Sequence, residues 1–435
     1  MRIAICTLGC KVNQYETQAI ERELLRRGHA LVDFEDTADA YIVNTCSVTA
    51  VSDRKSRQML RRAKARNPAA VIAACGCYAQ THPDDVSALG VDVLAGTNDR
   101  GGFLDLVEQA ARRREAGDAA CIVHLDDALR RREFEVLPAG GMAARTRAML
   151  KIEDGCRNFC SYCLIPFARG PVRSLPMDEA SLQVKELVDK GYREIVLTGI
   201  EISSYGQDIS ESTHLIDLVE LVCREAPALR VRLGSLEPRT ITRDFCERAA
   251  RLDNLCPHFH LSLQSGCDAT LHRMNRRYDT ARYYESCALL REYFDDPAIT
   301  TDLIAGFPEE TEEEFAETLA FLARCAFAAM HVFPYSSRPG TKAAELKQVD
   351  KATREARAAR AAEAARAMKA AYLARCVGKT LDVLFEGGAE TGSVGHAPNY
   401  MEVCVEHDGL QNELRPVRIL RSDGERLYGV PEEEA

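Results

Sequence analysis

Short apolar runs alternate with amphipathic stretches along the first part of the chain. Four of these runs have the length and composition of buried strands: Ile3–Leu8, Ala40–Val43, Val71–Ala74 and Val91–Ala95. The stretches between them have helical character, as in Thr17–Arg27, which ends at Gly28. Strands that alternate with helices indicate a parallel sheet with helices on both faces. Residues 1–137 are therefore predicted to form a doubly wound α/β domain.

A second series of alternating runs begins at Thr146, after a linker at Pro138–Gly141. Its six strand candidates are Ala148–Ile152, Glu194–Leu197, Val231–Leu233, Phe259–Leu263, Thr300–Ile304 and Met330–Phe333. Six β/α units in about 190 residues predict a (β/α)6 partial barrel, whose chemistry belongs at the C-terminal ends of the strands. A long charged helix at Thr341–Arg375 follows, and the unit is expected to span residues 138–372.

The pattern changes again after Gly378, where glycine-containing turns separate short β runs. These runs are Leu381–Phe385, Met401–Val405, Pro416–Leu420 and Leu427–Val430. They predict a small antiparallel β-barrel over residues 373–435. A possible hairpin is also expected earlier, within the charged connection Cys121–Val136.

Composition restricts the class of protein. The chain has 435 residues, a formal net charge of −10, and 17 cysteines without a tryptophan. Such an odd, large number of cysteines favours a reduced intracellular protein with metal-binding thiols over a disulfide scaffold. No apolar run is long enough to span a membrane and no signal peptide is evident, so we expect a cytoplasmic protein with no membrane partner. The acidic balance argues mildly against a nucleic-acid partner.

The stretch Lys151–Gly170 carries the most specific chemistry. Cys156, Cys160 and Cys163 form a C-x3-C-x2-C run on a glycine-punctuated loop. Thiolates hold 4Fe–4S clusters, and a set of three leaves one iron open to a reactant. The alternative is a structural zinc loop, but zinc sites usually show paired C-x2-C knuckles.

With Tyr162 before its last cysteine, this loop resembles the signature of the radical S-adenosylmethionine (SAM) enzymes. The resemblance implies a 4Fe–4S cluster whose open iron chelates the methionine part of SAM. The segment LTGIEISSYG, with Gly199 and Glu201, resembles the superfamily motif that holds the SAM ammonium. Tyr162, Gln264 in SLQSG, and Gly306, whose backbone would approach the adenine, are further expected SAM contacts.

Three dispersed cysteines indicate a second metal site. Cys10 follows the first predicted strand, Cys46 ends the second and Cys77 ends the third. Ligands of an open parallel sheet bind outside the carboxyl ends of its strands, where these thiols would converge. Spacing alone leaves Cys6 and Cys75 as competitors, and all of them could be ordinary buried residues.

The segments LGCKVNQYET, NTCSVT and GCYAQ resemble the three N-terminal motifs of the methylthiotransferases, and this likeness extends over the whole chain. It implies that Cys10, Cys46 and Cys77 hold an auxiliary 4Fe–4S cluster, and that Cys6 and Cys75 belong to the strand core. The C-terminal barrel resembles the TRAM domain, which binds RNA.

LGCKVNQYE most resembles the branch that acts on N6-threonylcarbamoyladenosine at tRNA position 37. The isopentenyladenosine branch tends to read GCQMN, and the branch that modifies a ribosomal-protein aspartate reads GCxKN before an acidic residue. The implied reaction places a methylthio group on adenine C2, using two 4Fe–4S clusters and SAM. It also implies a sulfur source and an electron donor such as flavodoxin or ferredoxin. A non-catalytic Fe–S protein that binds RNA is the alternative from another class.

A basic helix is the expected tRNA contact. Residues 53–66 carry seven basic side chains against one acidic, directly after the Cys46 loop. Arg54, Arg57 and Arg61 share one face of that helix, and Arg62 and Arg66 share another. Since the C-terminal segment from Tyr372 has six basic against twelve acidic residues, the first face is the better candidate for phosphate.

Overall fold

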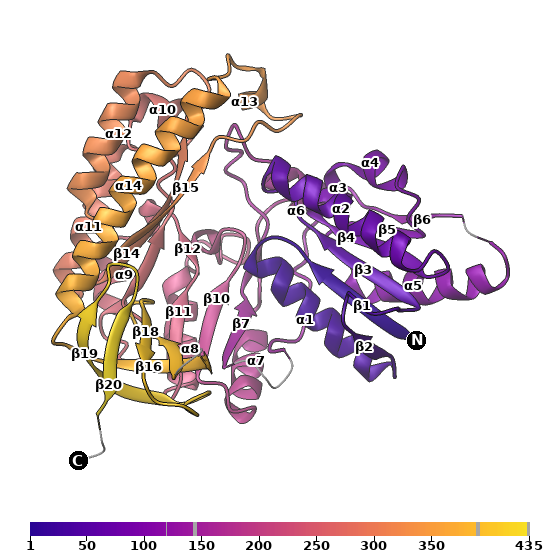
Figure 1. The fold of residues 1–435 in the computed structure, drawn as a ribbon, viewed down its shortest axis with the longest axis horizontal. Coiled ribbons are helices and arrows are strands. Elements are labelled where there is room, and N and C mark those ends of the chain that lie inside the picture. Colours follow the sequence, from indigo (N-terminus) through magenta and orange to yellow (C-terminus); the bar gives the residue numbers. More distant parts are fainter. Residues whose placement is uncertain (119, 142–145, 389–391, 433–435) are drawn as a thin grey trace.

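The computed structural model describes residues 1–118, 120–141, 146–388 and 392–432. The N-terminal unit is a parallel sheet of the order β2-β1-β3-β4-β5-β6 (Figure 1). Its strands are β1 (Arg2–Thr7), β2 (Ala30–Val32), β3 (Ala40–Thr45), β4 (Val71–Gly76), β5 (Val93–Ala95) and β6 (Ile122–His124). Separate apolar cores lie on its two faces, one around Ile42 and Phe103 and the other around Tyr41 and Leu60. The predicted doubly wound arrangement is confirmed.

Helices of this unit begin earlier than the sequence pattern indicated. The helices are α1 (Lys11–Arg26), α2 (Ala50–Arg66), α3 (Cys77–Thr81), α4 (Pro83–Ser87) and α5 (Arg100–Glu115). Helix α1 begins directly after Cys10, because Gly9 adopts a φ of +104° that turns the chain sharply. A Cβ on Gly9 would lie 2.7 Å from Cys46 Sγ, so this turn requires glycine.

The hairpin expected within Cys121–Val136 is wrong. Strand β6 pairs in parallel with β5 at the edge of the sheet, and a short 3-10 helix, η1 (Ala128–Arg130), follows it. The charged residues after β6 offer no second apolar run with which a hairpin partner could be built.

The central unit is the predicted partial barrel of parallel strands, split into a sheet β7-β10-β11 and a sheet β12-β13-β14-β15. The strands are β7 (Arg147–Lys151), β10 (Glu194–Thr198), β11 (Arg230–Leu233), β12 (Ser235–Leu236), β13 (His258–Leu261), β14 (Ala298–Ala305) and β15 (Ala329–Pro334). A small antiparallel pair, β8 (Glu153–Asp154) and β9 (Arg173–Ser174), flanks the cysteine loop. Strand β12 is the one barrel strand that the apolar pattern did not indicate.

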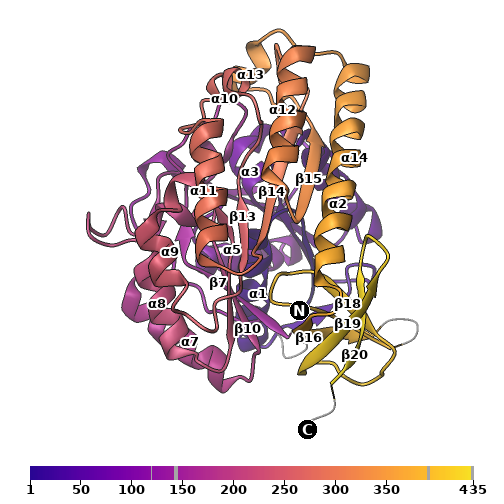
Figure 2. The ribbon, with the colours of Figure 1, turned by 90° about the vertical axis from the view of Figure 1, so that its left-hand side faces the viewer.

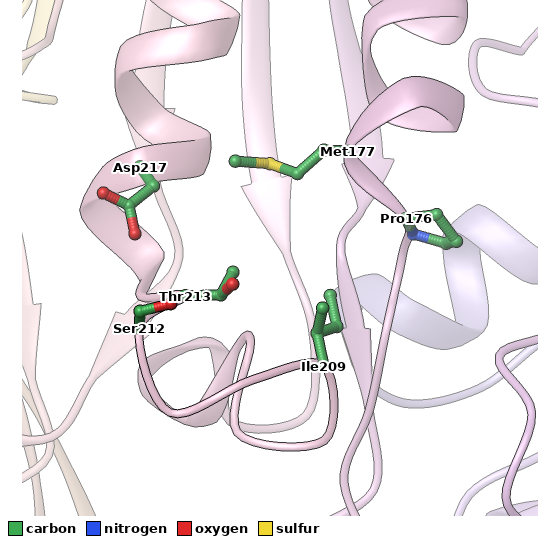
Figure 3. A pocket seen from close by; sticks show the side chains of 6 residues that line it. All are labelled: Pro176, Met177, Ile209, Ser212, Thr213 and Asp217. Carbon is green, nitrogen blue, oxygen red and sulfur yellow. The ribbon is translucent and has the colours of Figure 1, made fainter.

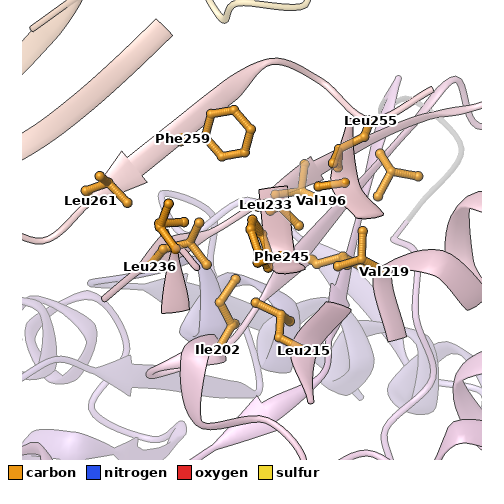
Figure 4. Close-up of a cluster of buried hydrophobic side chains, with 14 of the residues drawn as sticks. Val196, Ile202, Leu215, Val219, Leu233, Leu236, Phe245, Leu255, Phe259 and Leu261 are labelled. Atoms are coloured by element: carbon orange, nitrogen blue, oxygen red, sulfur yellow. The ribbon is translucent and has the colours of Figure 1, made fainter. Parts of the chain in front are cut away.

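Helices cover the outer face of this barrel (Figure 2). They are α7 (Met177–Asp189), α8 (Leu215–Glu225), α9 (Arg243–Ala249), α10 (Asp268–Arg273), α11 (Thr280–Tyr293), α12 (Glu312–Cys325) and α14 (Lys351–Cys376). Helix α6 (Ile165–Arg169) instead packs against α3 and η1, and α13 (Lys342–Glu345) packs against the cysteine loop, where Ala343 N–H donates to Ser161 O at 2.8 Å. Two further turns, η2 (Ile202–Ser204) and η3 (Pro238–Thr240), are 3-10 helices. Leu215 and Phe245 from the outer helices pack with Leu233 and Phe259 from the strands in one buried core (Figure 4). Burial of this apolar surface provides the main stabilisation of the barrel.

The C-terminal unit is a closed barrel with the strand order β16-β17-β18-β20-β19, consistent with a TRAM-like domain. The strands are β16 (Thr380–Gly388), β17 (Ser393–His396), β18 (Glu402–Val405), β19 (Leu414–Ser422) and β20 (Leu427–Pro431). All pairs are antiparallel except β18 with β20, and β17 was not predicted because its four residues include a glycine.

A loop of this C-terminal barrel covers the N-terminal end of the central one. Arg232 donates to Pro398 O at 2.8 Å, and Arg230 donates to Asp382 O at 3.0 Å. The ring of Tyr400 lies under the Arg232 guanidinium, 4.7 Å away. These contacts attach the C-terminal barrel to β11 of the central one.

No helix in the described part of the chain is both long and apolar enough to cross a membrane.

Candidate functional site

The C-x3-C-x2-C loop lies at the C-terminal end of the central barrel, as predicted. Gly155, with a φ of +95°, precedes it, and a Cβ there would collide with the backbone of Pro171. The loop borders a cavity of about 150 Å3. That cavity is lined by Cys156, Asn158, Cys160, Tyr162, Cys163, Ile165, Ile200, Glu201, Ser235, Leu236, Glu237, Ser262 and Arg276. The three cysteines therefore share one hollow with two of the expected SAM contacts, Tyr162 and Glu201.

Hydrogen-bond donors already face these sulfurs. The backbone N–H of Asn158 donates to Cys156 Sγ at 3.5 Å, and that of Ile165 donates to Cys163 Sγ at 3.4 Å. N–H···S hydrogen bonds of this kind stabilise and tune Fe–S clusters. Burial raises the pKa of Cys163 to about 12, so cluster binding must displace a proton. The loop fits a 4Fe–4S cluster.

Glu201 offers an unused acceptor to the same cavity. Its Oε2 accepts from the Ser204 hydroxyl, whereas its Oε1 is buried without a hydrogen-bond partner. Burial and the nearby Glu237 carboxylate raise the pKa of Glu201 to about 7. A cationic ligand would satisfy Oε1 and favour the ionised form, which suits the ammonium group of SAM.

The other three expected SAM residues do not line this cavity. Gly199 is packed against Glu153, whose side-chain oxygen would lie 2.9 Å from a Cβ at that position. Gln264 bridges to β14 through its backbone, in a left-handed conformation with a φ of +68°. A Cβ on Gly306 would collide with Arg354 of α14, so α14 accounts for the need for glycine there.

Sequence reasoning missed Arg276, which lines the same cavity. Its guanidinium donates to Cys160 Sγ at 3.1 Å and to Glu237 Oε1 at 2.9 Å. It is almost fully buried. The segment HRMNRRY contains several basic residues, and no spacing rule distinguishes this one from its neighbours.

The second cysteine triad also comes together, at the carboxyl edge of the N-terminal sheet. The pKa of Cys46 is raised, chiefly by burial and also by Cys10. Burial raises the pKa of Cys77 to about 12, and both Cys10 and Cys46 contribute to that shift. The backbone N–H of Val48 donates to Cys46 Sγ at 3.4 Å. Cys75, by contrast, points into the apolar core of the sheet.

The two triads lie near each other at the junction of the two domains. Cys77 is among the groups that raise the pKa of Cys163, which places the two thiols in electrostatic range. Among the described residues, no three His, Cys, Asp or Glu side chains converge closely enough to hold a single metal ion. A cluster of four irons is wider than one ion, and open triads with N–H donors suit it better.

A buried ion network joins the domains directly beneath this junction. Glu16, on α1, pairs with Arg100 at 2.7 Å and with Lys151 at 3.1 Å. It also accepts from Arg169, which donates to Asn13 Oδ1 at 2.8 Å and whose charge opposes the rise in the pKa of the Cys77 thiol. Arg169 thereby connects the loop of the first triad to α1 of the N-terminal domain.

The basic helix α2 divides into two unequal faces. Arg62 and Arg66 both pair with Glu35, so their charge is partly neutralised. Arg57 donates to Tyr78 Oη at 2.6 Å, next to Cys77. Arg54 and Arg61 are exposed and have no ion pair within the described ranges. Of the three residues expected to contact tRNA, two are therefore fully available for phosphate.

A larger pocket, of about 440 Å3, lies between the starts of α7 and α8 (Figure 3). Its walls include Met177, Ile209 and Asp217, and Asp217 pairs with Arg248 at 2.6 Å. None of the candidate cysteines or SAM contacts lines it.

Two family models match the chain. The Radical SAM superfamily model matches residues 150–322, and the model of the Uncharacterized protein family UPF0004 matches residues 2–96. Among solved structures, the radical S-adenosylmethionine methyltransferase TsrM from Kitasatospora setae, with cobalamin and a [4Fe-4S] cluster bound, has a TM-score of 0.57. At 13% identity over 79% of this chain and 77% of that one, this likeness concerns the fold alone.

Curated relatives extend over nearly the whole chain. "Threonylcarbamoyladenosine tRNA methylthiotransferase MtaB" of Bacillus subtilis (strain 168) is 39% identical over 97% of this chain and 94% of its own. The protein of the same name from Aquifex aeolicus (strain VF5) is 39% identical over 80% and 83%. "tRNA-2-methylthio-N(6)-dimethylallyladenosine synthase" of Symbiobacterium thermophilum is 32% identical over 98% and 94%. The chain belongs to the radical SAM tRNA methylthiotransferases, a family of enzymes that use SAM and a 4Fe–4S cluster.

Proposed function

We propose that this enzyme inserts a methylthio group at C2 of N6-threonylcarbamoyladenosine at position 37 of tRNA. The observation that carries the proposal is the pair of neighbouring cysteine triads, with Cys163 in electrostatic range of Cys77. The names of the two relatives at 39% identity support the choice of base. Residues 1–137, 138–372 and 373–435 are proposed as the domain of the second triad, the radical SAM domain and the TRAM-like domain.

Two 4Fe–4S clusters are assigned to the triads. Cys156, Cys160 and Cys163 would hold the cluster that, when present, supplies the electron for reductive cleavage of SAM. Cys10, Cys46 and Cys77 would hold the auxiliary cluster. A radical route is needed because the C2–H of adenine is unactivated, and no base could ionise it at neutral pH.

The side chains around the first triad would bind SAM and enclose the cavity. Glu201 would bind the SAM ammonium through its unpartnered Oε1, and Tyr162 would close the cavity beside the cluster. Gly199, Gln264 and Gly306 would act, if they contact SAM, through their backbones. The buried cavity wall would exclude water from reactive species.

Two requirements of the reaction lie outside the chain, a sulfur source and an electron donor, for which flavodoxin or ferredoxin is the expected class. The reaction would take place in the cytoplasm. The tRNA would meet Arg54, Arg57 and Arg61 beside the second triad, with the acidic C-terminal barrel contributing less.

A second candidate substrate is adenosine 37 with a dimethylallyl group, because relatives at 32% identity carry that name. Nucleoside mass spectrometry of tRNA from a deletion strain distinguishes the threonylcarbamoyl substrate from the dimethylallyl substrate. Loss of 2-methylthio-N6-threonylcarbamoyladenosine, restored by the wild-type gene and not by the Cys77→Ala gene, supports the proposal. Loss of the dimethylallyl product, or of a modified ribosomal aspartate, contradicts it.

A further inference from the structure

Arg276 brings a buried positive charge into contact with the first triad. Its Nη1 donates to Cys160 Sγ at 3.1 Å, its Nη2 to Glu237 Oε1 at 2.9 Å and its Nε to Tyr278 Oη at 3.0 Å. The side chain is 6% exposed and lines the cavity that the three cysteines border. Each of the three guanidinium nitrogens therefore has a partner, which fixes the plane of this rigid group against Cys160.

The residues just before Arg276 are hydrogen bonded to the cysteine loop. The Asn275 side chain donates to Phe159 O at 2.9 Å, and Ser161 N–H donates to Met274 O at 3.0 Å. Asn275 has a φ of +58°, the left-handed conformation in which many helices end, and it follows α10. Because these two bonds lie on either side of the middle cysteine, the backbone itself places Arg276 beside that cysteine.

Glu237, the counter-charge of Arg276, is fixed in its turn. Its Oε1 also accepts from Asn158 Nδ2 at 3.2 Å, and its Oε2 accepts from Arg239 at 3.1 Å. Its backbone N–H donates to Ser203 Oγ at 2.8 Å, and its side chain is 5% exposed. The two residues form a buried ion pair whose positive member contacts a cysteine.

The three sulfurs of the loop receive donors of different strength. Backbone N–H groups face Cys156 and Cys163 at 3.5 and 3.4 Å, whereas a guanidinium faces Cys160 at 3.1 Å. A hydrogen bond from an ionised donor is roughly twice as strong as a neutral one. A 4Fe–4S cluster gains one negative charge on reduction, and a nearby cation and hydrogen bonds to its sulfurs favour that state.

We propose that Arg276, through its hydrogen bond to Cys160, raises the reduction potential of the cluster on the first triad, and that Glu237 limits this effect. The inference rests on the part of the proposed function that assigns a 4Fe–4S cluster to this triad, and not on the choice of tRNA base. Arg276 acts here through Cys160, so it is a positioning residue. The higher potential lets an external donor of the flavodoxin or ferredoxin class transfer its one electron more readily.

The test measures the reduction potential of the first cluster alone, in full-length protein that carries Cys10→Ala, Cys46→Ala and Cys77→Ala. Redox dyes set the potential, and electron paramagnetic resonance quantifies the reduced cluster. At the midpoint potential of this background protein, adding Arg276→Met should lower the ratio of reduced to oxidised cluster about tenfold, which corresponds to about 59 mV. Arg276→Lys, which keeps the charge, should lower the ratio less.

Two further variants distinguish an effect of charge from an effect of structure. Glu237→Gln removes the opposing carboxylate and should shift the ratio in the other direction, toward the reduced cluster. Arg277→Met removes the same charge one position along the chain, where the side chain is exposed and water and salt screen it. It is the matched control and should leave the ratio unchanged.

Arg276→Met leaves Glu237 buried without its counter-charge and for that reason could lose iron. In that event, the double variant with Glu237→Gln removes both charges and should have a lower potential than Glu237→Gln alone.

Equal midpoint potentials in Arg276→Met and Arg277→Met, or shifts in the same direction in Arg276→Met and Glu237→Gln, would overturn the proposal. So would a loss of SAM affinity in Arg276→Met at an unchanged potential, which would make Arg276 a ligand of SAM. A background protein that never holds about four irons would instead overturn the assignment of a cluster to the first triad, and this inference with it.

Discussion

Arg338 of the central barrel donates to Asp53 of the N-terminal domain across 2.8 Å, and both side chains are buried. The same Nη2 atom donates to Ser47 Oγ at 2.7 Å, one residue after Cys46. The loop that carries Cys46 is therefore attached to the loop that follows β15. Together with the Glu16 network, this contact holds the domain of the second triad against that of the first.

Replacing Arg338 with Met should loosen this attachment. Asp53 would be left buried without its counter-charge, which costs about 3 kcal/mol. Hydrogen exchange at the N-terminal end of α2 should increase, and the double variant with Asp53→Asn should recover part of the protection. Arg62→Gln, which breaks an exposed pair with Glu35, serves as the control and should change little. Unchanged exchange in Arg338→Met would show that the contact does not hold the loop.

Iron content tests the two-cluster proposal. Anaerobically reconstituted wild-type protein should contain about eight irons, and replacing all three cysteines of either triad with Ala should leave about four. Cys75→Ala should keep about eight, because Cys75 lies in the apolar core. Wild-type protein that never exceeds about four irons, or that binds only zinc, contradicts the proposal.

The pH dependence of SAM binding should report on Glu201. Its raised pKa, about 7, means that the carboxylate loses its charge as the pH falls through neutrality. Because the ionised form would bind the SAM ammonium, the Kd for SAM should rise about tenfold for each pH unit below that value and level off above it. Titration calorimetry of the cluster-loaded protein at a series of pH values measures this Kd.

Glu201→Gln should bind SAM weakly and without this dependence, whereas Asp217→Asn, in the unrelated pocket, should behave as the wild type. A pH profile that is the same in Glu201→Gln and in the wild type would exclude Glu201 as the titrating group.

The salt dependence of tRNA binding should reveal which arginines contact phosphate. Each lost contact lowers the slope of log affinity against log salt by about 0.7 to 0.9. Since Arg57 is bonded to Tyr78, the triple change of Arg54, Arg57 and Arg61 to Gln should lower the slope by about 1.5 rather than by the full value for three contacts.

The matched control for this helix is Arg62→Gln with Arg66→Gln, whose charges are shared with Glu35. It should alter the slope less than the triple change. If changes at Arg415, Arg418 and Arg421 have the larger effect instead, the C-terminal barrel is the RNA-binding surface.

The sequence alone determined the local chemistry and the fold class. A C-x3-C-x2-C run is complete within eight residues, and the alternation of apolar runs with helices follows from local periodicity, so both can be predicted without coordinates. Strands β2, β6, β12 and β17 were not predicted as separate strands, and each has only two to four residues. Strands β5 and β11 are as short, and their apolar content rather than a period indicated them. At that length no period of two can be recognised.

Only the tertiary structure decided how the separate motifs meet. The approach of Cys163 to Cys77 and the hydrogen bonds of Arg276 to Cys160 and of Arg169 to Asn13 join residues far apart in the chain. Nothing in their local spacing predicts these contacts, because they depend on how two sheets and a small barrel pack against one another. The candidate cysteines can be identified from the sequence. The charged side chains near them can be identified only from the way in which the domains pack together.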